Sequence, residues 1–264
     1  MSAPIVALAT TLGLSLAMMG AWWVQRATGN AGYVDAVWSF ALGAAGVAGG
    51  LTAPGPRGVL VAALAALWAL RLGGHILRRT LGGPEDSRYA RLRAEWGTRF
   101  QARMFGFLQI QAAVAALLAV AFLLAARNPA RLGVTDALGV ALFAAGVAGG
   151  ALADATLARF RRDPANHGAL CERGLWRYSR HPNYFFEFLT WCAWPLLAIA
   201  PGDAAEYPWG WLALGAPALI YGLLVHVSGI PPTEAAMLRS RGESFRAYQA
   251  RTRPFLPLPK RSPR

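Results

Sequence analysis

The stretch GLWRYSRHPNYFFE, residues 174–187, combines residue types that can bind a ligand and take part in chemistry. Pro182 suits the first turn of a helix, where no backbone donor is needed, and such a helix would place Asn183 and Glu187 one turn apart on one face. The N–H groups at this helix start, with Arg180 just outside them, would form an anion site. A carboxylate at Glu187 suits a hydroxyl or an amide N–H instead. The stretch therefore fits a ligand that is anionic outside and neutral inside, as a nucleotide cofactor is.

The acidic residue Asp35, within YVDAVWSF at residues 33–40, is a second candidate for chemistry. At helical spacing Asp35 shares one face with Trp38 and Ser39. Two interpretations stay open. The carboxylate can complement the dipole at the start of a helix, or it can be a functional group at the membrane, where an ionisable side chain is costly unless it is paired or used. His75, near the end of another apolar run, raises the same question.

Two further groups of charged residues lie in polar segments. The first follows Gly-Gly-Pro and consists of Glu85, Asp86, Arg88 and Tyr89. Two acids beside an arginine and a tyrosine have the donors and acceptors to hold a ribose, its phosphate and a base. The second lies in ADATLARFRRD, where Asp154 precedes a group of arginines that includes Arg161. An ordinary charged loop and a cluster that stops membrane insertion are the respective alternatives.

The elements that position these residues are predicted by hydropathy. The chain has 264 residues, of which 55% are hydrophobic, and the apolar residues are concentrated in seven runs. The runs are 3–24, 33–51, 58–77, 107–125, 134–153, 184–200 and 209–228. Each is about long enough to cross a hydrocarbon layer of ~30 Å, and a backbone exposed to lipid must form its own hydrogen bonds. We therefore predict an all-α, polytopic membrane protein with seven transmembrane helices, forming a single domain over 1–264.

The net charge of +13 is distributed asymmetrically. Most of the 26 Lys and Arg residues lie in alternate loops, chiefly 78–106, 154–183 and the tail 229–264. The positive-inside rule places these segments and the C-terminus in the cytoplasm and the N-terminus outside. This placement explains the charge by membrane topology, so we predict no nucleic-acid partner and a cofactor site on the cytoplasmic face. Cys171 and Cys192 have no metal-binding spacing, and no metal is expected.

The segments YVDAVW, EDSRY, RYSRHPNYFFEF and ESFRAYQARTRPFLP together resemble the bacterial membrane relatives of steroid 5α-reductase, over roughly residues 30–260. The strongest motif is G-L-W-R-Y-S-R-H-P-N-Y-x-x-E at 174–187. The resemblance implies a multi-pass protein of the bacterial inner (cell) membrane. It also implies NADPH as cofactor and reduction of the conjugated C=C bond of a lipophilic enone, such as a 3-oxo-Δ4-steroid.

Carried over position by position, the resemblance implies an NADPH site made of Asp154, Arg161, Tyr178, Arg180, His181, Asn183, Tyr184 and Glu187. It extends to the residues Arg79, Glu85, Asp86, Arg88 and Tyr89. The substrate is expected along Trp38 and Ser39.

The group that stabilises the substrate carbonyl is open between Tyr33, Asp35 and His75. Vertebrate members of the family pair a Gln-Glu on the second helix with a Tyr on the third. This chain instead has Tyr33 and Asp35 on the second and His75 and Ile76 on the third.

Two other functional classes are compatible with parts of this pattern. A similar R-H-P-x-Y-x-x-E segment occurs in integral-membrane methyltransferases of the isoprenylcysteine and phospholipid type, which use S-adenosylmethionine and would act here on a lipid or prenylated substrate. A non-enzymatic lipid-binding or scaffold protein is the third class. The acidic residue in the 33–51 run and the many arginines favour the reductase. The expected partners are a lipophilic small molecule and membrane lipid.

Overall fold

The computed structural model describes residues 2–199 and 207–259, and this part of the chain is all-α. The helices are α1 (Ala3–Thr28), α2 (Tyr33–Leu51), α3 (Pro56–Thr80), α4 (Ser87–Trp96), α5 (Phe100–Arg127), α6 (Val134–Arg162), α7 (Pro182–Ala198), α8 (Gly215–Tyr221) and α9 (Ile230–Arg251). Short 3₁₀ helices are Gly97–Arg99, Pro164–Asn166, Gly174–Arg177 and Pro208–Leu214, and Gly222–Val227 is a π-helix. The predicted fold class, all-α, is confirmed.

Six helical segments of the described chain are long and apolar enough to cross a membrane. They are Ala3–Thr28, Tyr33–Leu51, Pro56–Thr80, Ser87–Arg127, Val134–Arg162 and Pro208–Arg251. The remaining predicted span, 184–200, coincides with α7, which has 17 residues and begins at Pro182 as the sequence predicts. Residue 200 lies outside the described residues, as does the end of the predicted tail 229–264. The chain is thus compatible with a multi-pass membrane protein.

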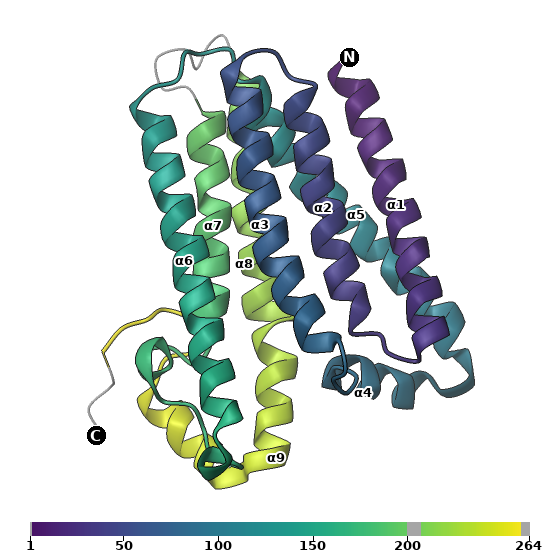
Figure 1. Cartoon of the computed structure of the whole chain (residues 1–264), viewed down its shortest axis with the longest axis vertical. Helices are drawn as coiled ribbons and strands as arrows, with labels where there is room; N and C mark the ends of the chain where they lie inside the picture. The colour runs from purple at the N-terminus through teal and green to yellow at the C-terminus, as the bar shows by residue number, and fades with distance from the viewer. Residues whose placement is uncertain (1, 200–206, 260–264) are drawn as a thin grey trace. The chain divides into compact units, whose positions relative to one another are not determined.

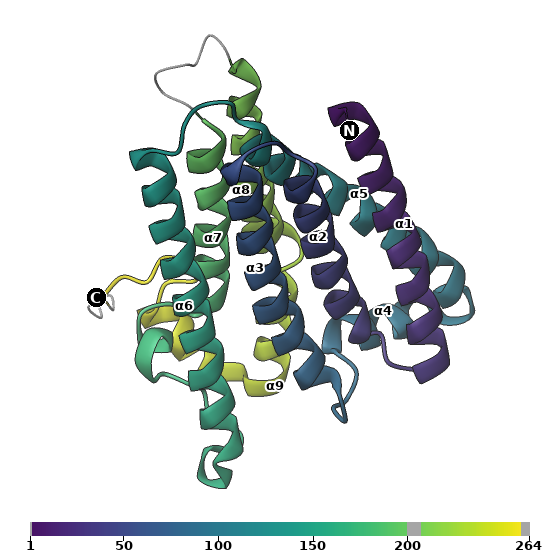
Figure 2. The ribbon, with the colours of Figure 1, turned by 45° about the horizontal axis from the view of Figure 1, so that its top comes forward.

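The chain forms two compact units, which we describe separately. Unit 1 comprises Met1–Gly139 and Trp194–Ala216, and unit 2 comprises Val140–Ala193 and Pro217–Arg264. In unit 1, α1, α2 and α3 run side by side, and α4 lies near the end of this layer (Figures 1 and 2). Close packing of α2 on α3 depends on small residues: a Cβ added at Gly43 would overlap Ala69, and one at Gly50 would overlap the backbone of Gly58.

A buried ion pair joins several segments of unit 1 away from the predicted site residues. Arg57 at the start of α3 is 4% exposed and pairs with Asp136, which is also buried at 4%. The two terminal nitrogens also donate to the carbonyl oxygens of Ala130, Arg131 and Leu197 at 3.0, 3.1 and 3.0 Å. Because a carbonyl or carboxylate meets each of its terminal nitrogens, Arg57 fixes the α5–α6 loop against the end of α7 in this unit.

Unit 2 is built on close contact between α6 and α7. A Cβ added at Gly146 would overlap the Thr190 hydroxyl, and one at Gly149 would overlap the Phe186 ring. The similar sequences GAAGVAGG at 43–50 and AAGVAGG at 144–150 therefore serve the same purpose in the two units, since small residues let helices approach closely.

The C-terminal part of unit 2 folds back on itself. Figure 1 shows α9 doubling back, and the reversal occurs at Gly242, whose φ of 48° is in the region that favours glycine. The chain after α9 then runs beside the segment before α7, where Ser179 and Arg253 form a β-bridge. This reversal brings residues from both arms of α9 to the start of α7.

Candidate functional site

The first group of predicted site residues meets in unit 1, and we call it the Asp35 cluster. Its members are Asp35, Arg79, Glu85, Asp86, Arg88, Tyr89 and Arg93. The Asp35 carboxylate accepts hydrogen bonds from Arg88 Nη2 at 2.5 Å and from the Tyr89 hydroxyl at 2.7 Å. Tyr89 is 2% exposed. The structure therefore brings together the acid of the 33–40 segment and the polar segment 85–89, which are predicted separately from the sequence.

Two further carboxylates shape this cluster. Asp86 caps the start of α4 by accepting from the Arg88 backbone N–H at 3.0 Å, and it also accepts from Arg79 Nη2 at 3.1 Å. Burial alone would raise the pKa of Asp86, but the Arg88 charge and N–H groups hold that pKa below its usual value. Asp86 is thus an ionised acceptor that ties the end of α3 to the start of α4.

Glu85 connects the same segment to the α1–α2 loop. Its carboxylate accepts from the backbone N–H of Ala31 at 3.0 Å and from Arg93 Nη2 at 2.7 Å. Burial would raise the pKa of Glu85, whereas the bonds from Arg93 and Ala31 lower it, and the net direction is downward. The acids of the cluster therefore already have protein donors, which limits their availability to a ligand.

The residues expected to line a substrate also have structural partners. The Ser39 hydroxyl is 1% exposed and donates to the Asp35 carbonyl one turn earlier. The Trp38 indole N–H donates to the Gln111 carbonyl at 3.1 Å, and its ring packs edge-on against Trp68. Tyr33, the first residue of α2, and His75, in the last two turns of α3, are both partly exposed.

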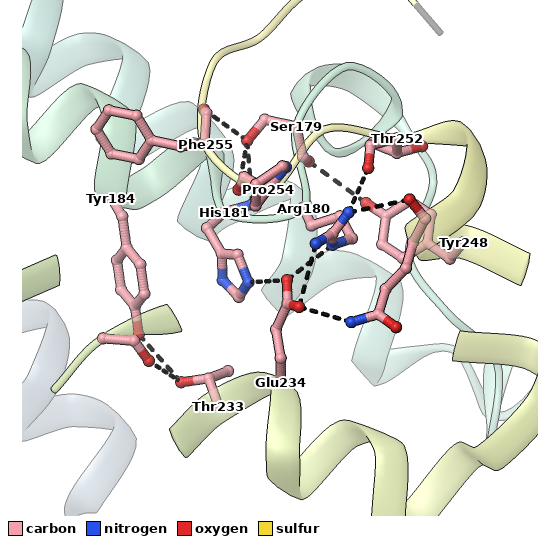
Figure 3. A network of polar contacts seen from close by, with 12 residues as sticks. Ser179, Arg180, His181, Tyr184, Thr233, Glu234, Tyr248, Thr252, Pro254 and Phe255 are labelled. Atoms are coloured by element: carbon pink, nitrogen blue, oxygen red, sulfur yellow. Dashed lines mark hydrogen bonds and ion pairs between the residues drawn. The ribbon is translucent and has the colours of Figure 1, made fainter. Parts of the chain in front are cut away.

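The second group meets in unit 2, and we call it the Glu234 cluster: Arg180, His181, Glu234 and Thr252, which Figure 3 labels, and Gln249, which donates to Glu234. Arg180 Nε and Nη2 donate to the two oxygens of Glu234 at 2.7 and 3.1 Å. Another nitrogen of the same guanidinium, Nη1, donates to the Thr252 carbonyl. Arg180 is only 8% exposed. Its guanidinium is therefore bound to other parts of the chain and is not a solvent-accessible site for phosphate.

The C-terminal tail is held on the same segment. The Ser179 hydroxyl donates to the Phe255 carbonyl at 2.8 Å (Figure 3). The Arg180 backbone N–H donates to the Arg253 carbonyl at 2.9 Å. The Phe255 ring packs edge-on against Phe185 and Phe188. Residues 253–255 are thereby hydrogen-bonded to the RHPNY segment and packed on the start of α7, so they help to fix its conformation.

His181 is the titratable group at the centre of the Glu234 cluster. Its Nε2 lies 3.0 Å from Glu234, and its ring stacks on Tyr184 with centroids 5.3 Å apart. Burial lowers the pKa of His181 and the Arg180 charge lowers it further, whereas Glu234 acts in the opposite direction, and the net direction is downward. His181 is therefore neutral at pH 7.

This shift has a consequence for stability. Because the folded-state pKa of His181 is below the unfolded value of about 6.5, the unfolded chain binds the proton more readily. We expect the melting temperature in detergent to fall as the pH is lowered through and below about 6.5. His181→Gln should flatten this dependence, while His167→Gln, at an exposed position, should leave it unchanged. Equal slopes for wild type and His181→Gln would contradict this assignment.

Asn183 and Glu187 lie one turn apart on α7, inside the same unit. Glu187 accepts the Trp191 indole N–H at 2.9 Å. The Asn183 Oδ1 is buried and has no hydrogen-bond partner in the described chain. Such an orphaned acceptor costs about 1–3 kcal/mol, which a donor from a ligand would recover. Tyr184 contacts Thr233 through the two hydroxyl groups at 3.4 Å.

The remaining predicted residues differ in accessibility. Asp154 is buried on α6, while Arg161, two turns later on the same helix, is exposed. Tyr178, two residues before Arg180 in the sequence, is 40% exposed. In unit 1 the Arg79 side chain is 50% exposed. These three side chains are therefore accessible to solvent, whereas Arg180 is not. In the part of the chain that the structure describes, no His, Cys, Asp and Glu side chains form a metal-binding group.

Glu234, which was not among the predicted site residues, accepts hydrogen bonds from Arg180, His181 and Gln249. One signal was available: Glu234 is the first charged residue after the apolar run 209–228. An ionisable side chain close to a predicted span is costly unless it is paired, so Glu234 calls for a partner.

A protein-family model described as "Protein of unknown function (DUF1295)" matches residues 21–252, which is most of the chain. No curated protein and no solved structure matches the sequence.

Proposed function

This chain belongs to the DUF1295 family, and from that premise we propose that it is a membrane-bound, NADPH-dependent reductase related to steroid 5α-reductase. It would reduce the conjugated C=C bond of a lipophilic enone, such as a 3-oxo-Δ4-steroid. The proposal includes seven spans in a bacterial inner membrane, with the N-terminus outside and the C-terminus in the cytoplasm. In that topology the cofactor would arrive from water and the substrate from lipid.

The observation that carries the proposal is the start of α7 in unit 2. There Asn183 Oδ1 is a buried acceptor without a partner in the described residues, within one turn of Glu187. Both are acceptors, so they suit a donor such as the N–H or O–H group of a neutral ligand moiety. The exposed arginine Arg161 belongs to the same unit and can bind phosphate bidentately. These residues fit a nucleotide cofactor.

Residues of α2 and α3 in unit 1 are the candidates for a second part of the proposed chemistry. When bound, NADPH would supply a hydride to the β-carbon of the enone and become NADP⁺. Negative charge then develops on the substrate carbonyl oxygen, where a positioned donor stabilises it, and a proton added to the α-carbon completes the reduction. Asp35 already accepts from Arg88 and Tyr89. Because both oxygens of Asp35 are occupied by these donors, we assign the group that donates to the substrate carbonyl to Tyr33 or His75.

The role we assign to Asp35 is to hold Arg88 and Tyr89 in place beside the start of α2. Two partly buried hydrogen bonds, from Arg88 and from Tyr89, orient the carboxylate in addition to any helix-dipole interaction, which is worth about 0.3–1 kcal/mol. This favours a site over a simple N-terminal acid.

The assay that tests the proposal uses the full-length protein in nanodiscs with NADPH and either androstenedione or progesterone. We expect substrate-dependent loss of NADPH absorbance and, by mass spectrometry, a product heavier by two hydrogen atoms. Absence of both, together with saturable binding of S-adenosylmethionine, would overturn the reductase proposal and favour the methyltransferase. Saturable binding of neither cofactor would favour a non-enzymatic lipid-binding protein.

A further inference from the structure

Glu234 occupies an unusual position for a carboxylate in a polytopic helical protein, because both of its oxygens are filled by protein donors. Oε1 receives Arg180 Nε at 2.7 Å and faces His181 Nε2 at 3.0 Å. Oε2 receives Arg180 Nη2 at 3.1 Å and Gln249 Nε2 at 2.7 Å. The side chain of Glu234 is 12% exposed. It therefore joins the start of α7 to both arms of α9.

This arrangement decides the tautomer of His181. An ionised carboxylate only accepts hydrogen bonds, so the contact with Glu234 requires a proton on His181 Nε2. Arg180 already neutralises the carboxylate through two hydrogen bonds, and the His181 ring is 5% exposed, which disfavours a second buried positive charge. A neutral ring with Nε2–H leaves a lone pair on Nδ1.

We propose that Glu234 is a positioning residue that holds His181 as a neutral acceptor, so that His181 binds a hydroxyl or N–H group of the ligand and not its phosphate. No hydrogen bond falls on His181 Nδ1 from any residue in the ranges 2–199 and 207–259. The ring plane is fixed by stacking on Tyr184, which lies 8° from parallel. This role rests on the proposed cofactor site at the start of α7. In that site, the group that donates to His181 Nδ1 would be a ribose hydroxyl or a carboxamide N–H.

The side chain of Gln249 and the backbone of the tail also hold Glu234 and Arg180 in place. Gln249 comes from the second arm of α9, after the reversal at Gly242, and Thr252 and Phe255 follow it on the same side of the α7 start. Arg180 therefore joins Glu234 at one end and the tail backbone at the other. Loss of Glu234 would free both Arg180 and His181 from the orientation that the structure shows.

The first measurement is independent of any ligand. Nitrogen NMR of ¹⁵N-histidine-labelled full-length protein, with His181→Gln to assign the signal, should show the Nε2–H tautomer of neutral His181 at pH 7. Glu234→Gln should retain the fold and broaden or shift this signal toward a tautomer mixture. Glu243→Gln is the matched control, because Glu243 is on the same helix with a side chain 84% exposed. A protonated or Nδ1–H ring in the wild type would overturn the proposal.

The second measurement uses NADPH itself as the probe, with affinity read by fluorescence titration. Asparagine can place an acceptor where Nδ1 lies, whereas glutamine reaches the Nε2 position and keeps the contact with Glu234. We expect His181→Asn to bind NADPH at least tenfold more tightly than His181→Gln, and Glu234→Gln to weaken binding at least tenfold. The opposite order of the two His181 variants would show a purely structural role and overturn the proposal.

The two measurements distinguish failure of the proposed NADPH site from failure of the role proposed for Glu234. If the wild-type protein binds no NADPH, the cofactor assignment fails, while the NMR tautomer still decides whether Glu234 orients His181. If NADPH binds but Glu234→Gln changes neither the tautomer nor the affinity, the cofactor site stands and the role of Glu234 is refuted.

Discussion

Replacing Asp136 by alanine is expected to lower the free energy of unfolding by about 3–5 kcal/mol, because it leaves the buried charge of Arg57 without its partner. Arg57 and Asp136 are each 4% exposed, so neither can recover its interactions from water. Asp136 also accepts the backbone N–H of Gly133 at 2.8 Å, which is lost in the same variant. The measurement is denaturant unfolding of the purified protein in detergent micelles.

Two control variants test whether the lost stability comes from the uncompensated charge of Arg57. Glu95→Ala removes an exposed partner of Arg91 and should change the unfolding free energy by less than about 1 kcal/mol. The double variant Arg57→Met with Asp136→Leu removes both charges and should recover most of the stability lost in Asp136→Ala. If the single and double variants are equally unstable, the loss comes from the Gly133 turn and the carbonyl contacts, not from an uncompensated charge.

Replacing Glu187 by alanine is expected to weaken NADPH binding by roughly tenfold to a hundredfold, the loss of one hydrogen bond to a charged group. Glu187 lies one turn into α7 from Asn183 and has its carboxylate oriented by the Trp191 indole N–H at 2.9 Å. The same titration with NADPH measures this effect. Trp191→Phe, which removes the orienting N–H but keeps the carboxylate, should show a smaller loss.

The matched control for Glu187→Ala is Asp35→Asn in the other unit. It keeps the size of the side chain and removes the charge that pairs with Arg88. We expect NADPH affinity within a few-fold of wild type and a reduced rate of enone reduction. Equal losses of cofactor affinity in the two variants would refute the separate roles that we assign to Asp35 and Glu187.

The helices themselves were predictable from local properties of the chain. In the described chain each of the seven apolar runs overlaps helical structure, and α2 has the predicted bounds, 33–51. The start of α7 at Pro182 also follows from the sequence, because proline at a first helical turn loses no hydrogen bond. Apolar length and the position of proline are properties of a few adjacent residues, so no tertiary information is needed to interpret them.

The last apolar run shows the limit of such arguments. The run 209–228 has the composition of one membrane-spanning helix, but the structure divides it into the 3₁₀ helix Pro208–Leu214, α8 and the π-helix Gly222–Val227. The π-helix ends where a Cβ at Gly229 would overlap the Leu224 carbonyl. Hydropathy reports only that a segment is apolar, and the three helical forms differ in hydrogen-bond register, which depends on packing.

The partners of the polar side chains could be determined only from the tertiary structure. The sequence by itself determined that this is an α-helical chain with membrane-length apolar runs and a polar RHPNYxxE stretch at the start of a helix. Only the fold decided that Arg180 is committed to Glu234 and that Asp35 accepts from Arg88 and Tyr89. These partners are about fifty residues apart in the chain, and spacing along a helix predicts neighbours only within a turn or two. Whether an arginine is open to phosphate or closed on a carboxylate is settled by those distant contacts.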